Sequence, residues 1–202
     1  ILAALLSFQT YALKRLLNEK SALIYAFLIS IEPYMIGINR WFHQTSFEVF
    51  FGFTAVLFIL LWNKHKKSTY IILSAVFLAL SILSKVTSLI LGPVFAYYLI
   101  KHLIKNKDIK PLIIYFLTLT TTLFILFPAL WVRPVQVLTK IYSAITTAVE
   151  SGYGNKLNPT ISLFYYFIIL GFKLSPITTV IFMFSLLNFK KMKNENKQKR
   201  FY

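Results

Sequence analysis

The sequence contains no cysteine, few glycines and prolines, and only six acidic residues among its 202 positions. Without cysteine there can be neither a disulfide framework nor a thiolate metal site. A glycine-rich phosphate loop, a nucleophile elbow and an HExxH zinc motif are also missing from the chain. Because no period of roughly 20–50 residues and no low-complexity tract occurs, we expect neither a repeat array nor a second domain.

Apolar residues dominate what is present. The chain is 57% hydrophobic and 17% aromatic, with a mean hydropathy of +0.68, far above soluble domains. We therefore predict an all-α fold, a polytopic transmembrane helical bundle in the cell membrane. Seven apolar segments are long enough to cross a hydrocarbon layer about 30 Å thick, provided that the bilayer is locally thinner around the shorter ones. They lie near residues 1–13, 21–37, 46–62, 69–84, 86–100, 111–130 and 175–189.

The net charge of +16 would suggest nucleic acid in a soluble protein. Here the basic residues instead form short clusters between apolar segments, which is typical of cytoplasmic loops, so we expect membrane lipids and no nucleic acid as partners. The clusters are Lys14, Arg15 and Lys20; Lys64, Lys66 and Lys67; Lys101, Lys105, Lys107 and Lys110; and six basic residues between 190 and 200. We predict a bundle over 1–189 and a basic cytoplasmic tail over 190–202.

The opposite, outer side then receives residues 38–46, the turn at Lys85 and a long loop from Trp131 to about Ser175. Within that loop, "TISLFYYFIILGF" (160–172) is apolar enough to look like another span. If it crossed the membrane, the basic tail would lie outside, against the orientation rule. We expect this segment to lie in the outer interface or to re-enter the bundle part-way.

Charged groups at membrane depth are usually paired or turned toward a cavity that does chemistry or transport. Five residues that are or can become cationic converge on the outer side: Arg40, His43, Lys85, Arg133 and Lys173. Each alone fits a snorkelling side chain that reaches lipid phosphates. Together they predict an anion site, for which a lipid-linked phosphate is the natural ligand.

Lys85 interrupts the apolar stretch 69–100, and the short helices expected on its two sides predict that it is recessed below the outer surface. Glu32 precedes Pro33, which should kink the second span. Glu48 should either pair with a nearby cation or orient His43. His43 has no second ligand at i+3 or i+4, so no metal site is predicted. We expect His65 and His102, in basic clusters, to be solvated.

Four segments resemble, in order, a known enzyme family. "IEPYMIGINRWFHQTSFEVFFGFTAVLFILLW" is similar to a stretch of protein-mannosyltransferase-type glycosyltransferases, family 39 of the GT-C fold, where a Pro precedes "SRxxHTD" and a long apolar helix. "ALSILSKVTSLILGPVFAYYLI" resembles the next segment, "LTKxPALLLLP". "FPALWVRPVQVLTKIYSAITTAVESGYGN" and "LNPTISLFYYFIILGFKLSPITTVIFMFSLL" resemble a later pair. The matches run from about 32 to 187.

The resemblance implies a polyprenyl-phosphate-linked sugar donor and transfer to an acceptor on the outer face, and it is compatible with a divalent metal. Lys85 would be the family's lysine, partnered with the donor phosphate. We expect Arg133 and Arg40 to bind the same phosphate, with support from His43, Glu32, Glu48 and Lys173. The sequence departs twice, with Thr45 in place of the family's Asp and Ser88 in place of a Pro. We expect an N-terminally truncated chain whose catalytic carboxylate lies before Ile1.

The sequence leaves three functions open. A GT-C glycosyltransferase requires a basic rim that holds the donor phosphate as leaving group. A transporter or flippase of a lipid-linked or anionic substrate predicts charges near the membrane midplane and an internal duplication, which the sequence lacks. A structural subunit predicts no convergent outer cations. The first is favoured, while the sugar and the acceptor are not assigned.

Overall fold

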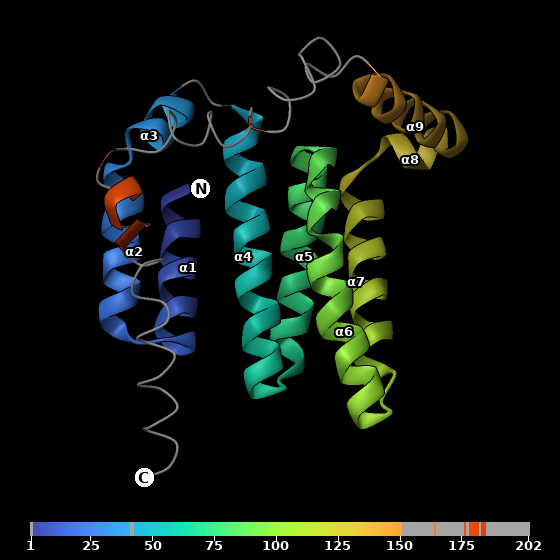
Figure 1. Ribbon diagram of the computed structural model, residues 1–202. Coiled ribbons are helices and arrows are strands. Elements are labelled where there is room, and N and C mark those ends of the chain that lie inside the picture. The colour runs from blue at the N-terminus through green and yellow to red at the C-terminus, as the bar shows by residue number, and fades with distance from the viewer. Residues whose placement is uncertain are drawn as a thin grey trace.

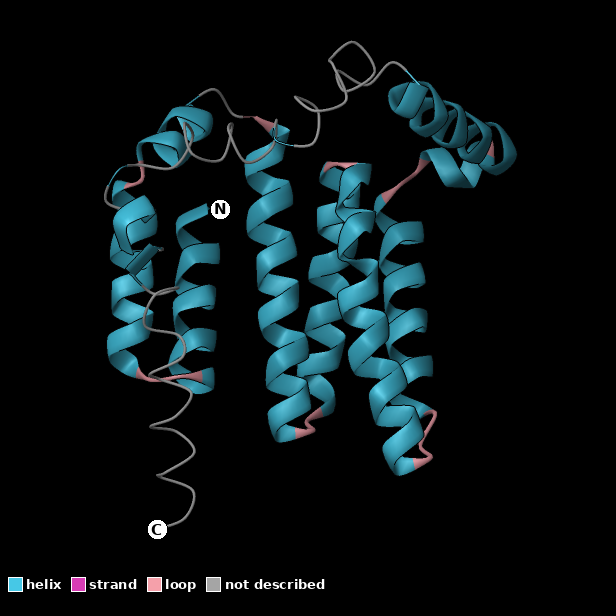
Figure 2. Ribbon diagram, in the orientation of Figure 1, coloured by secondary structure: helices cyan, strands magenta, loops and turns pink. Residues whose placement is uncertain are grey.

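The computed structural model describes residues 2–40 and 43–150, together with 164, 176, 178–181 and 183–184. All the secondary structure in this described part is helical (Figure 2), which confirms the all-α prediction. The elements are α1 (Leu2–Leu16), α2 (Glu19–Ile31), α3 (Pro33–Arg40), α4 (Gln44–His65), α5 (Ser68–Ser84), the 3-10 helix η1 (Val86–Leu91), α6 (Gly92–Asn106), α7 (Lys110–Leu126), α8 (Ala129–Val132) and α9 (Pro134–Glu150).

The long helices stand side by side as an antiparallel bundle (Figure 1). Helix α1 contacts α2 and α4, helix α5 contacts α4 and α7, and helix α6 contacts α4 and α7. The short connections require this alternation, because a chain that turns back at once packs against the helix it has just left. Helices α3, α8 and α9 lie at the end of the bundle where α4 begins and α5 ends (Figure 1).

Helix ends follow local chemistry. Asn18 caps α2, with its Oδ1 accepting a hydrogen bond from the Ser21 N–H at 2.8 Å. Glu32 has extended backbone angles (φ −66°, ψ 113°), because a residue before proline is pushed out of the helical region. Pro33 then starts α3. The predicted kink is confirmed, and the predicted span 21–37 consists of two helices.

In the part of the chain that the structure describes, two helices are long and apolar enough to cross a membrane. They cover Gln44–His65, with 22 residues and a mean hydropathy of 1.8, and Val86–Asn106, with 21 residues and 1.4. Helices α5 and α7 are also apolar but have 17 residues each, about 25 Å of helix. Six of the seven predicted spans fall on described helices, and the number of membrane crossings stays a prediction. The seventh, 175–189, lies mostly outside the described residues.

The bundle core combines aromatic rings with very small residues. Phe58 of α4 stacks on Phe77 of α5, with ring centroids 5.7 Å apart. Ala55 and Ala75 are fully buried between the same helices, and a Cβ placed on Gly52 would lie only 2.9 Å from Leu91 Cδ1. Small residues let helices approach closely, which matters where lipid supplies no hydrophobic drive between them. Large apolar side chains instead cover the outer flanks of the helices, as on a lipid-facing surface.

Candidate functional site

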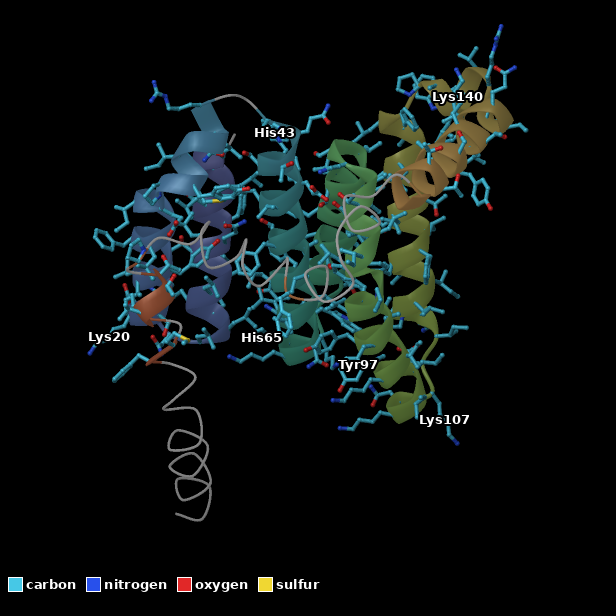
Figure 3. The ribbon with its side chains drawn as sticks, turned by 45° about the horizontal axis from the view of Figure 1, so that its top comes forward. Lys20, His43, His65, Tyr97, Lys107 and Lys140 are labelled. Carbon is cyan, nitrogen blue, oxygen red and sulfur yellow. The ribbon has the colours of Figure 1, made fainter. Side chains whose placement is uncertain are left out.

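Because the long helices alternate in direction, the charged residues at their ends fall into two groups, one at each end of the bundle. Arg40 ends α3, His43 caps α4, Lys85 ends α5, and Arg133 joins α8 to α9, and all these boundaries lie at one end of the bundle (Figure 1). Figure 3 shows His43 and Lys140 at that end, whereas Lys20, His65 and Lys107 lie toward the other. The basic clusters around residues 14–20, 64–67 and 101–110 therefore share the far end. Lys173, the fifth predicted cation, lies outside the described residues.

Lys85 lines a cavity of about 640 Å³ at the first of these ends. The cavity is walled by α5, α7, α8 and α9, and its lining residues are Gln44, Ile82, Leu83, Ser84, Lys85, Val86, Leu123, Leu126, Phe127, Leu130, Leu138 and Ile141. Lys85 is thus the charged residue in a lining that is otherwise apolar except for Gln44 and Ser84. An amphipathic ligand with one anionic group and a long apolar part fits such a surface.

The backbone at Lys85 is extended (φ −160°, ψ 129°), and its N–H donates to the Ser81 carbonyl at 3.0 Å. The side chain is exposed, which differs from the predicted recessed position. Two α-helices were expected around it, but η1 follows Lys85 as a 3-10 helix. The ammonium makes no hydrogen bond or ion pair to any described residue, so it is available to an anion in the cavity.

The other predicted cations do not line this cavity. Arg133 donates to Gln136 Oε1 at 3.4 Å on the first turn of α9. Arg40 ends α3, on the far side of α4 from the cavity-lining helices (Figure 1). His43 uses Nδ1 to accept a hydrogen bond from the Thr45 N–H at 3.2 Å, and so caps α4. The structure therefore brings the four described cations of the predicted five to one end of the bundle, and of these four only Lys85 lines the cavity.

Glu48 has a different role from either one predicted for it. Its Oε1 accepts hydrogen bonds from the hydroxyls of Thr87 and of Ser88, the latter at 3.3 Å. Ser81 and Ser88 hydroxyls lie 2.7 Å apart, and Ser81 also donates to the Glu48 carbonyl at 2.8 Å. No cation and no contact to His43 is part of this network of described residues. Glu48 instead connects α4 to the break between α5 and η1, next to Lys85.

Glu32, the other predicted acidic residue, is buried at the C-cap of α2. Its Oε2 accepts a hydrogen bond from the Thr178 hydroxyl at 2.6 Å. This contact joins positions 146 residues apart, and it connects Thr178 to the α2–α3 kink. The role of Glu32 in support of the site stays a prediction.

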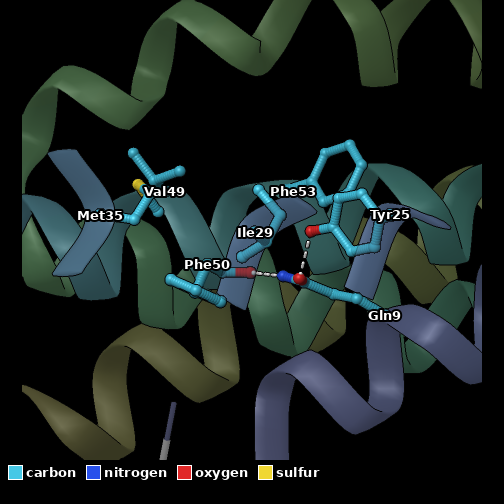
Figure 4. Close-up of a pocket in the computed structure, with 7 residues that line it drawn as sticks. All are labelled: Gln9, Tyr25, Ile29, Met35, Val49, Phe50 and Phe53. Atoms are coloured by element: carbon cyan, nitrogen blue, oxygen red, sulfur yellow. Dashed lines mark hydrogen bonds between the residues drawn. The ribbon is translucent and has the colours of Figure 1, made fainter. Parts of the chain in front are cut away.

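A second, smaller cavity of about 240 Å³ lies between α1, α2, α3 and α4 (Figure 4). Gln9 is fully buried beside it. Its Nε2 donates to the Phe50 carbonyl at 2.9 Å and to Thr54 Oγ1 at 3.0 Å, and its Oε1 accepts from the Tyr25 hydroxyl at 2.6 Å. This cluster was not predicted, although Gln9 is a strongly polar residue inside an apolar window of the sequence and could have indicated it.

The part of the chain that the structure describes contains no set of side chains arranged to bind a metal ion. No group of three or more His, Asp or Glu residues there is placed to hold an ion. His102, expected to be solvated, packs on Trp62 with ring centroids 4.9 Å apart and receives hydrogen bonds at Nδ1. His65 is exposed, as expected.

Comparison with known proteins gives one result. A family model described as dolichyl-phosphate-mannose-protein mannosyltransferase matches residues 1–132. The match covers helices α1 to α8 and includes Lys85, Glu48 and most of the lining of the larger cavity. No curated protein and no solved structure matches the chain.

Proposed function

The chain belongs to the dolichyl-phosphate-mannose-protein mannosyltransferase family, and from that premise we propose that it transfers a sugar from a polyprenyl-phosphate-linked donor to an acceptor on the outer face of the membrane. Family membership makes it a membrane glycosyltransferase. The choice of donor and the position of its phosphate are our inference. The observation that carries it is the cavity of about 640 Å³, which is lined mostly by apolar side chains and has Lys85 in its lining.

The two parts of such a donor match the two parts of the cavity. A polyprenyl chain is apolar and flexible, so side chains such as Leu123, Leu126 and Leu138 can cover it without leaving a polar group unpaired. The phosphate needs a cation, and Lys85 is the charged group in the lining. A compact ammonium suits a phosphate oxygen as a point charge. We place the phosphate at Lys85 and the start of the polyprenyl chain between α5, α7 and α9.

Lys85 would then act on the leaving group. Transfer breaks the bond between the anomeric carbon of the sugar and a phosphate oxygen, and that oxygen gains negative charge as the bond breaks. A fixed ammonium beside it stabilises the transition state more than the ground state. One such contact contributes about 3 kcal/mol, or roughly a hundredfold in rate. The base that deprotonates the acceptor hydroxyl is not assigned, since Glu32 and Glu48 are both engaged by hydroxyl donors.

The distribution of charge supports an enzyme over a transporter. A transport path predicts ionisable groups deep inside the bundle. In the described residues the buried polar side chains along the helices are uncharged, such as Gln9, Thr54 and Ser74. The buried carboxylate, Glu32, lies at a helix end. We therefore favour a site at one membrane surface.

We also propose the orientation of the bundle. The end with the lysine-rich loops faces the cytoplasm, in keeping with the bias of basic residues toward that side, and the cavity faces outward. The chain then crosses the membrane about seven times, with the basic tail 190–202 in the cytoplasm. Lys173 would join the outer rim.

A photoreactive donor tests the function without knowledge of the acceptor. A polyprenyl-phosphate mannose with a diazirine near the phosphate is crosslinked to the purified protein, and the labelled peptides are mapped. Label should concentrate on residues 82–86, 123–130 and 138–141, and unlabelled donor should compete for it. Label confined to the lipid-facing flank of α2, or spread over all helices without competition, would contradict the proposal.

A further inference from the structure

The end of the bundle far from the cavity holds a fixed cation. The Lys66 ammonium lies 4.6 Å from the centre of the Trp62 ring, and it contacts Asn63 Oδ1 and His102 Nδ1, each at 3.3 Å. Lys66 has a left-handed backbone (φ 57°) at the C-cap of α4, which directs its side chain back across the helix end toward α6. The amide of Asn106 also lies 2.8 Å from His102 Nδ1. With two donors converging on that nitrogen, the imidazole is neutral.

Two further lysines on α6 act on the same place. Lys101 and Lys105 are both exposed. Desolvation by burial lowers the pKa of Lys66, and the positive charges of Lys105 and Lys101 lower it further. Lys101 Nζ donates to the Tyr97 hydroxyl at 3.3 Å and lies 5.3 Å from the centre of that ring. Three like charges crowd one another here, and among the described residues none of them has a carboxylate within ion-pair distance. Such crowding is unfavourable unless an anion binds.

Some of the other charged groups at this end have partners. Lys64 donates to the carbonyls of Arg15 and Leu16 at 2.9 and 3.1 Å, and so caps α1. Lys14 pairs with Glu19 at 3.1 Å. Asp108, the nearby carboxylate, accepts a hydrogen bond from the Lys110 N–H at 3.0 Å. Lys66, Lys101 and Lys105 differ from the remaining lysines because both α6 lysines act on a Lys66 ammonium that is held against Trp62.

We propose that Lys66, Lys101 and Lys105 form a binding site for the phosphate of an anionic membrane phospholipid. The neighbouring surface of α6 is what selects a lipid. Four residues share one face of the helix at i, i+3, i+4 and i+7 spacing: Tyr97, Ile100, Lys101 and Ile104. Tyr97 is 56% exposed, Ile100 is 49% exposed and Ile104 is 74% exposed. An acyl chain can lie along the isoleucines while its phosphate reaches the lysines. Basic pockets between helices bind lipid head groups in this way.

The site is independent of the donor cavity, which lies at the other end of the bundle, and it would stabilise the α4–α6 contact. The test uses the purified full chain in non-ionic detergent. Short-chain phosphatidylglycerol, phosphatidylcholine or inorganic phosphate is titrated in, and the midpoint of thermal unfolding is followed. Only phosphatidylglycerol should raise the midpoint saturably, because binding to the folded state alone stabilises it.

Matched variants separate a built site from general positive charge. Lys101→Gln/Lys105→Gln leaves the Lys66 contacts with Trp62, Asn63 and His102 intact, and without lipid it should unfold at the wild-type midpoint or slightly above it, because the crowding of like charge is relieved. Its apparent affinity for phosphatidylglycerol should fall about 25-fold, or roughly fivefold for each lysine. Lys14→Gln/Lys20→Gln removes the same charge at the same end and should change the affinity less than about twofold. Lys101→Arg/Lys105→Arg should retain binding.

Three results would overturn the proposal. Equal weakening in both glutamine pairs would show diffuse attraction to a basic end rather than a site. Equal stabilisation by phosphatidylcholine would show that the site does not recognise the net negative charge of the lipid head group. The same rise with inorganic phosphate as with phosphatidylglycerol would assign the site to a soluble anion instead of a lipid.

Discussion

The Glu48 carboxylate accepts a hydrogen bond from the Ser88 hydroxyl at 3.3 Å, across the break that separates α5 from η1. Ser88 is buried, and its hydroxyl also lies 3.1 Å from the Ser81 carbonyl. The two residues are 40 positions apart, so the contact fixes the level of α4 against the turn that carries Lys85. The position of the proposed phosphate ligand therefore depends on a carboxylate that does not itself line the cavity.

Removing this carboxylate should loosen the turn. Glu48→Ala removes the acceptor of the Thr87 hydroxyl and one of the acceptors within reach of Ser88, at a cost of about 1 kcal/mol, and the midpoint of thermal unfolding in detergent should fall. Glu48→Gln keeps an oxygen acceptor and should fall less. Glu19→Ala, which removes an exposed ion pair at the other end, should be close to neutral. Equal midpoints for Glu48→Ala and Glu19→Ala would show that the network does not support the fold.

The buried Gln9 cluster should behave as one unit. Gln9→Leu leaves the Tyr25 hydroxyl without its acceptor and should destabilise the protein by about 1–3 kcal/mol. Tyr25→Phe removes one member of the pair and should cost less. Because the two side chains share a 2.6 Å hydrogen bond, the double variant should be less destabilised than the sum of the two single variants. Strict additivity in thermal unfolding would mean that the contact contributes nothing.

Helix packing at Gly52 should tolerate no side chain. A Cβ there would lie 2.9 Å from Leu91 Cδ1 and 3.0 Å from Ser81 Oγ, so Gly52→Ala forces the side chains of Leu91 and Ser81 to move, at about 1 kcal/mol or more. Gly37 is a matched control, because a Cβ at that position meets nothing within 4 Å. Gly37→Ala should be neutral or slightly stabilising, since alanine favours the helix. A stable Gly52→Ala protein with unchanged unfolding would contradict the close packing.

The proposed orientation can be read with single cysteines, because the natural chain has none. Lys140→Cys on α9 should react with an impermeant thiol reagent on intact cells, and Lys20→Cys should react only after the membrane is opened. Both positions are exposed and lie toward opposite ends of the bundle (Figure 3). Labelling of residue 20 but not of residue 140 on intact cells would reverse the orientation.

Much of the fold follows from local sequence signals. Pro33 after Glu32 predicts the kink, and apolar windows broken by lysine clusters predict both the helices and the separation of charge into two ends. These features are predictable because hydropathy, proline geometry and the cost of a charge in lipid act over short distances along the chain.

The site was less predictable because it depends on contacts between distant positions. The sequence placed Arg40, His43, Lys85 and Arg133 at one end, but it did not show that only Lys85 lines the cavity. Glu48 lies near His43 in the sequence, yet it bonds to Thr87 and Ser88. Its partner depends on the register between α4 and η1, which composition does not reveal.

The central claim is that Lys85 binds the donor phosphate, and the rate of sugar transfer tests it. In membranes that contain the protein and its natural acceptors, the release of labelled sugar from a polyprenyl-phosphate donor is compared for wild type, Lys85→Ala and Lys140→Ala at equal expression. Lys140 lies at the same end but is not part of the cavity lining, so its variant should keep wild-type turnover. Lys85→Ala should be slower by about a hundredfold, and Lys85→Arg should recover only part of the rate. Turnover by Lys85→Ala within a few-fold of wild type would contradict the assignment of the donor phosphate to this lysine.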